Sequence, residues 1–254
     1  MGLRDDIKAN FTDADGLVSP NPCDPSTHNA SNNGVCYSGE YITLLALTDL
    51  PHEGDLLAYA KVMEACKVPS YLGLINRSPI NTKDSESPDD FYGLFSGLYF
   101  SGLNSMSRDF LSYGLKHYGS FNNTNPGHFS WATCMYRQPQ LLAMNLWSAY
   151  PENKLIKILI FPLTLITAII IATACLGLTQ TAGADPWRLT WLLVQVAKRE
   201  SWLCKLASRL WYRRLDSVWG GMAQVAARYY KGLPGQDHPF VTAFAAVDTM
   251  KGSK

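Results

Sequence analysis

Three carboxylates lie in the sequence where they could act on a substrate. Glu40 follows Tyr37 within the segment NGVCYSGEY, and Asp89 and Asp90 lie side by side before an apolar run. Glycoside hydrolysis requires two carboxyl groups, about 5–5.5 Å apart for retention and about 6.5–9.5 Å apart for inversion. The three acids are therefore candidate catalytic residues. Alternatively, Asp89 and Asp90 interact with the positive end of a helix, and Glu40 is an acid in a first helical turn.

An asparagine-rich segment supplies candidate ligand-binding residues. The run SFNNTNPG at residues 120–127 is the strongest turn signal in the chain. Its amide side chains and a nearby imidazole suit sugar hydroxyls, and an indole ring offers a stacking face. Together with Tyr37, the candidates are Asn122, Asn123, His128 and Trp131. Alternatively, the asparagines serve left-handed turn geometry and cap the helix that follows.

Other kinds of chemistry find no support in the sequence motifs. The five histidines form neither an HxH nor an HExxH pattern, and no P-loop, GxGxxG or GxSxG motif occurs. We therefore expect no metal site and no cofactor. With 22 basic and 21 acidic residues, the chain has no net field to attract nucleic acid. The six cysteines form no CxxC pair and are expected to be free, mostly buried thiols.

The elements that must position these residues are predicted to be helices. No alternating strand of any length appears, whereas apolar residues recur at helical spacing. The expected helices begin near Ser38, near Leu56 and after Ser87, and cover residues 103–118 and 128–150, the last with a break near Pro139. Gly93, Gly97 and Gly102 would let a second helix approach closely. We therefore expect an all-α fold of roughly eight to ten helices.

The chain divides into a polar arm and one helical domain. Residues 1–34 are rich in Asn, Asp, Pro and Ser, and residues 35–250 are expected to form a single domain. Within it, Ile158–Leu178 carries no charge over 21 residues. A helix of that length reaches about 31 Å, enough to span a membrane. Alternatively, it is a buried central helix surrounded by the other helices. The chain start lacks an apolar signal-peptide region.

Several segments resemble an uncharacterised group of bacteriophage-encoded all-helical proteins. They include the segments NGVCYSGEY at 33–41, SPDDFYG at 87–93 and NNTNPG at 122–127, and the resemblance covers roughly residues 30 to 242. The group has no established activity, so the resemblance assigns no catalytic residue. The first segment is also similar to the first helical hairpin of (α/α) toroid enzymes that act on polysaccharides. This implies a toroid-like or irregular helical-hairpin array around the apolar central helix.

Three functions follow as hypotheses. The first is a phage structural or host-interaction protein, virion-associated, with a polar cleft that binds a host-envelope glycan. The second is a glycan-processing hydrolase or lyase of (α/α) toroid type, using Glu40, Asp89 and Asp90. The third is a single-span membrane-associated phage protein, held by residues 158–178. Expected partners are a host-envelope glycan or other phage proteins, in the virion or the host cytoplasm. The oligomeric state stays open.

Overall fold

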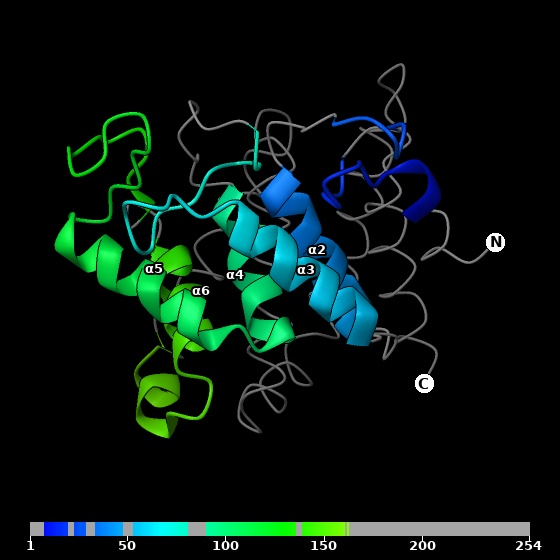
Figure 1. The fold of residues 1–254 in the computed structure, drawn as a ribbon. Helices are drawn as coiled ribbons and strands as arrows, with labels where there is room; N and C mark the ends of the chain where they lie inside the picture. Colours follow the sequence, from blue (N-terminus) through cyan, green and yellow to red (C-terminus); the bar gives the residue numbers. More distant parts are fainter. Residues whose placement is uncertain are drawn as a thin grey trace, which may run out of the picture.

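The computed structural model describes residues 8–19, 23–28, 34–47, 53–80, 90–135, 139–160 and 162 (Figure 1). Five long helices lie in these ranges: α2 (Gly34–Leu47), α3 (Glu53–Ala65), α4 (Asp90–Ser101), α5 (Asn104–Lys116) and α6 (Pro139–Ala149). The same ranges contain three isolated β-bridges and no strand. The prediction of an all-α fold is therefore confirmed for the described part of the chain.

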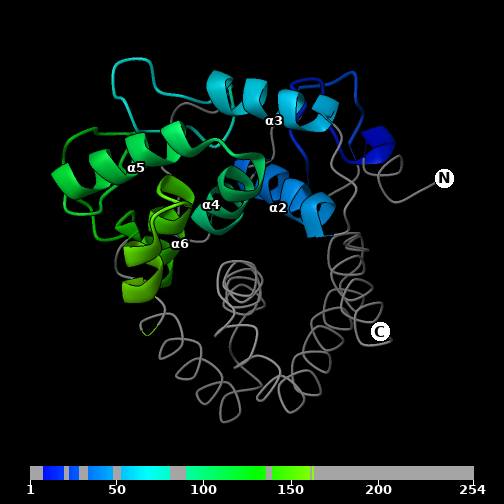
Figure 2. The same cartoon turned by 90° about the horizontal axis from the view of Figure 1, so that it is seen from below.

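The five helices form two layers. Figure 2 shows α2, α4 and α6 side by side in one layer, with α3 and α5 in a second layer beside them. Successive helices therefore alternate between the layers. Helices α2 and α4 run in the same direction, because Gly93 lies beside Cys36 while Ser96, one turn later, lies beside Thr43. Their N-terminal ends thus lie at the same end of the layer (Figure 1).

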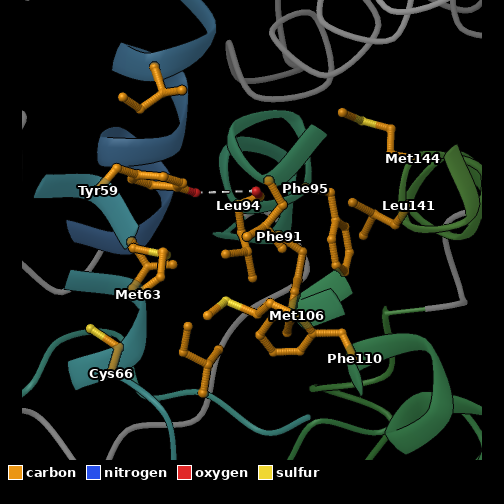
Figure 3. Close-up of a cluster of buried hydrophobic side chains, with 14 of the residues drawn as sticks. Tyr59, Met63, Cys66, Phe91, Leu94, Phe95, Met106, Phe110, Leu141 and Met144 are labelled. Carbon is orange, nitrogen blue, oxygen red and sulfur yellow. Dashed lines mark hydrogen bonds between the residues drawn. The ribbon is translucent and has the colours of Figure 1, made fainter. Parts of the chain in front are cut away.

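Aromatic rings fill the space between the layers. The ring centroids of Phe91 and Phe95 are 5.5 Å apart, and Phe95 meets Phe110 of α5 edge-on at 6.0 Å (Figure 3). The ring centroid of Phe121, in the loop after α5, lies 4.8 Å from that of Phe91. Rings at these separations combine a large buried apolar area with favourable edge and offset contacts. The aromatic cluster therefore joins α4, α5 and the following loop.

Two helix boundaries differ from the sequence prediction. Helix α2 begins at Gly34 instead of Ser38, because Val35 is buried and its amide donates to the Arg77 carbonyl at 3.3 Å. The predicted helix over residues 128–138 is wrong for the described residues 128–135, which form a loop without an α-helix. Helix α6 starts at Pro139. Proline suits this position, because the N–H groups of the first helical turn have no partner within the helix and proline lacks an N–H.

The apolar stretch is described only at its start. Residues 158–160 and 162 lie in the described ranges, and the rest of 158–178 lies outside them. In the described ranges no helix combines the length and the apolar character that crossing a membrane requires. Both interpretations of the stretch therefore remain predictions. Among the described residues, Cys23, Cys36, Cys66 and Cys134 are thiols outside any disulfide and all but Cys23 are buried, as predicted; Cys175 and Cys204 lie outside the described residues.

Candidate functional site

The segment that carries Glu40 packs against α4 with its backbone in direct contact. A Cβ atom added at Gly93 would overlap the carbonyl oxygen of Cys36, and one added at Gly39 would overlap the carbonyl oxygen of Gly93. At Gly97 an added Cβ would lie 2.5 Å from the Cα of Gly39. Only glycine permits this approach. The predicted close approach is therefore confirmed at Gly93 and Gly97.

Gly102 plays a different part from the two helical glycines. It follows the last residue of α4 with a φ angle of +74°, and a Cβ atom there would meet nothing within 4 Å. This left-handed conformation is typical of the residue that ends a helix. The prediction that Gly102 admits a neighbouring helix is wrong.

Glu40 is buried within this packing. Its side chain is 1% exposed, and its Oε1 atom lies 3.9 Å from the sulfur of Cys36, one turn earlier in α2. Because α2 begins at Gly34, Glu40 lies in the second turn, and the alternative that it is a first-turn acid is wrong. A general acid must reach its substrate within hydrogen-bond distance. The described fold gives Glu40 no exposed surface from which to do so.

The other catalytic candidates lie at the start of α4. Asp90 is the first residue of that helix, and Asp89 lies outside the described residues. The start of α4 lies beside the first turns of α2, since Cys36 lies against Gly93. The structure thus brings Glu40 and Asp90 onto adjacent parallel helices. It assigns no separation between their carboxyl groups.

The loop at residues 117–135, which we call the 117–135 loop, is held as a hairpin by its backbone. The Phe121 amide donates to the Thr133 carbonyl at 3.1 Å, and the Met135 amide donates to the Gly119 carbonyl at 2.8 Å. Two residues in it, Gly119 and Gly127, have φ angles of +79° and +85°. These conformations suit glycine, so the turn chemistry of the sequence matches the observed backbone.

The two asparagine candidates hold the loop in place. The Oδ1 atom of Asn122 accepts the Asn125 amide at 3.0 Å, a turn-forming contact. Asn123 is buried, and its Nδ2 donates to the Oδ1 of Asn76 at 3.1 Å. Asn76 precedes Arg77, whose carbonyl holds the first turn of α2. Asn122 thus fits the turn alternative, and Asn123 ties the loop to the N-terminal end of α2.

The ring-bearing candidates of the loop are exposed. Trp131 is 65% exposed, and His128 is also at the surface. Phe129 and Tyr118 are exposed as well, at 55% and 81%, and sequence reasoning missed both. Tyr118 has a left-handed φ of 54°. The glycine that follows it indicates the end of a helix, and this was the sequence signal that the Tyr118 ring could lie outside the core. The hairpin therefore presents several aromatic rings to solvent.

Tyr37 is separated from these rings. It lies in the first turn of α2, partly buried and packed against the hydrophobic core. Nearby, Tyr59 of α3 is buried and lies with its hydroxyl 3.5 Å from the Leu94 carbonyl oxygen (Figure 3). Burial raises the pKa of Tyr59 well above its ordinary value, and the neighbouring Cys36 and Cys66 thiols add to this shift. Both tyrosines thus belong to the packing between helices.

The candidate residues therefore divide into two groups. Glu40 and Tyr37 belong to the packed helices, whereas His128 and Trp131 belong to the exposed hairpin. The described residues contain no group of three His, Cys, Asp or Glu side chains that could hold a metal ion. No protein family, curated protein or solved structure matches the chain.

Proposed function

We propose that this protein is a phage-encoded helical interaction protein, virion-associated, that binds a host-envelope glycan through the 117–135 loop. The observation that carries the proposal is the exposure of Trp131 on a hairpin whose backbone is fixed by hydrogen bonds. An indole carried on a fixed backbone loses less conformational freedom when a sugar ring stacks on it than an indole on a mobile loop. The imidazole of His128 and the ring of Phe129 are also exposed on the same loop.

The burial of Glu40 supports binding over catalysis. A glycosidase needs a carboxyl group on each side of the scissile bond, and both must meet the sugar. Glu40 is packed between α2 and its neighbours instead. The exposed rings of the hairpin have no such obstacle, which is why we place the glycan there.

A glycan-processing enzyme of (α/α) toroid type is the second candidate. The alternation of α2, α4 and α6 with α3 and α5 between two layers favours it, since toroids alternate inner and outer helices (Figure 2). Because of the same alternation, we propose a full toroid of eight to ten helices with the apolar stretch 158–178 at its centre. In this version Glu40 and Asp90, on adjacent inner helices, act on the substrate after a rearrangement that uncovers Glu40.

Glycan binding is tested with purified oligosaccharides from bacterial envelopes. The probes are lipid-free lipopolysaccharide core oligosaccharide and peptidoglycan glycan strands, titrated against the full chain by calorimetry. Trp131→Ala should weaken binding about tenfold, the loss expected for one stacked aromatic ring. The matched control is Tyr150→Ala, which removes another exposed aromatic ring, after the end of α6. Equal affinities of the wild-type protein and Trp131→Ala would refute the proposed surface.

The enzymatic candidate is tested with the same oligosaccharides. Mass spectrometry of the mixture reveals chain cleavage by hydrolysis or elimination. An active enzyme releases shorter chains, and Glu40→Gln removes that activity while keeping the shape of the side chain. If the wild-type protein binds the oligosaccharides and leaves them intact, binding alone is the function.

A further inference from the structure

The segment of the chain that contains the 117–135 loop has no acidic residue. The sequence has no acidic residue between Asp109 and Glu152, and the formal charges within that segment are those of Lys116 and Arg137. Lys116 is the last residue of α5 and is exposed immediately before the loop begins. Across the whole chain, basic and acidic residues are nearly equal, at 22 and 21. An acid-free stretch of this length is therefore a local departure from that balance.

Two imidazoles belong to the same segment as the lysine. An added Cβ at Gly127 would lie 3.8 Å from the Cε1 atom of His117, so the loop tip passes beside that ring. His128 follows Gly127 and is exposed. The His117 ring is set by Tyr113, whose ring centroid lies 4.3 Å away. Neutral imidazole donates one N–H hydrogen bond and protonated imidazole donates two. Lys116 and His117 directly precede the exposed Tyr118, and His128 directly precedes the exposed Phe129, so hydrogen-bond donors flank exposed rings along the loop.

This distribution selects among glycans. A hydroxyl group accepts or donates with little regard to charge, whereas a carboxylate or phosphate favours a site with cationic donors and no opposing acid. Exposed aromatic faces bind the apolar side of a sugar ring, whatever its charge. We propose, on the basis of the proposed glycan binding, that the 117–135 loop selects negatively charged oligosaccharides, with Lys116 as the residue that sets the preference.

The test compares sugars that differ in charge alone. One pair is phosphorylated lipopolysaccharide core oligosaccharide before and after treatment with a phosphatase. The other pair is tetragalacturonate and its methyl ester, which has the same backbone without the carboxylates. The full chain should bind the charged member of at least one pair about threefold to fivefold more tightly at low salt. The pair that shows the difference identifies phosphate or carboxylate as the recognised group.

Two variants separate this inference from the proposed function. Lys116→Gln should remove most of the difference within the pair while neutral sugars still bind, and Lys61→Gln, an exposed lysine of α3, should keep it. Trp131→Ala should weaken both members of a pair alike. High salt should reduce the preference, since screened surface charges contribute less. Equal binding of charged and neutral sugars would overturn the charge preference, while the proposal of a glycan site on the loop would still hold. Failure of every sugar to bind overturns both.

Discussion

Two regions of the molecule differ in how they use their backbone. One is the contact between helices α2 and α4, and the other is the 117–135 loop. In the first, glycine backbones touch and no side chain separates them at Gly39 and Gly93. In the second, the backbone is fixed by hydrogen bonds and large side chains such as Trp131 lie in solvent. Two helices whose backbones touch leave no room between them for a ligand. A hairpin with a fixed backbone and exposed rings has a surface on which a ligand can bind. The comparison therefore places binding at the loop and stability at the helices.

The largest expected effect is at the helix contact. Gly93→Ala places a methyl group on the Cys36 carbonyl oxygen, a rigid backbone atom, so α2 and α4 must separate. Overpacking a core that cannot yield costs about 3 kcal/mol or more. Chemical denaturation followed by circular dichroism measures the loss.

The matched control for that variant is Gly54→Ala in α3. An added Cβ at Gly54 meets nothing within 4 Å, so the change should be neutral or stabilising by up to about 1 kcal/mol. If Gly93→Ala costs no more than Gly54→Ala, the two helices are not in backbone contact and the comparison fails.

The next effect concerns the hydrogen bond that joins the two regions. Asn123→Ala removes the donor to Asn76 and leaves the Asn76 side chain buried with one partner fewer. The expected loss of stability is about 1–3 kcal/mol. A double-mutant cycle with Asn76→Ala should give a coupling energy near 1 kcal/mol. Additive effects would show that the loop is anchored elsewhere.

Parts of this division could be read from the sequence, for local reasons. Gly93 and Gly97 are four residues apart, so they lie on one face of a helix, and their close contact was predictable. The burial of Glu40 was not, because it depends on where α4 lies against α2. The prediction that places the exposed Phe129 and Trp131 in a helix is wrong. A pairing between Ser120 and Cys134, 14 positions apart, sets that segment instead. Such non-local pairings leave no periodic signal in the sequence.

A smaller effect should appear in alkaline solution at Tyr59. Its folded pKa is raised above the ordinary 10.0, so it favours the folded state below pH 10 and this contribution is lost as pH rises further. Tyr59→Phe has no group to ionise. Between pH 10 and 12 the wild-type protein should therefore lose stability faster than the variant, by at most about 1.4 kcal/mol per pH unit.

Urea titrations at pH 8, 10, 11 and 12 measure this difference, with Tyr71→Phe as an exposed control. Parallel curves for the wild-type protein and Tyr59→Phe would mean that Tyr59 is accessible to water, and that the packing of α3 on α2 and α4 is looser than described.

The smallest expected effect on stability is at Trp131, and its small size is what makes the variant informative. A side chain that is 65% exposed contributes little to the core, so Trp131→Ala should change the free energy of unfolding by less than about 0.5 kcal/mol. The backbone hydrogen bonds of the hairpin and those of Ser120 and Asn123 should hold it in place in this variant. Any loss of glycan binding in this variant then reflects the missing indole. A large loss of stability would instead show that the ring packs against the protein, and that the loop belongs with the closed helix contact.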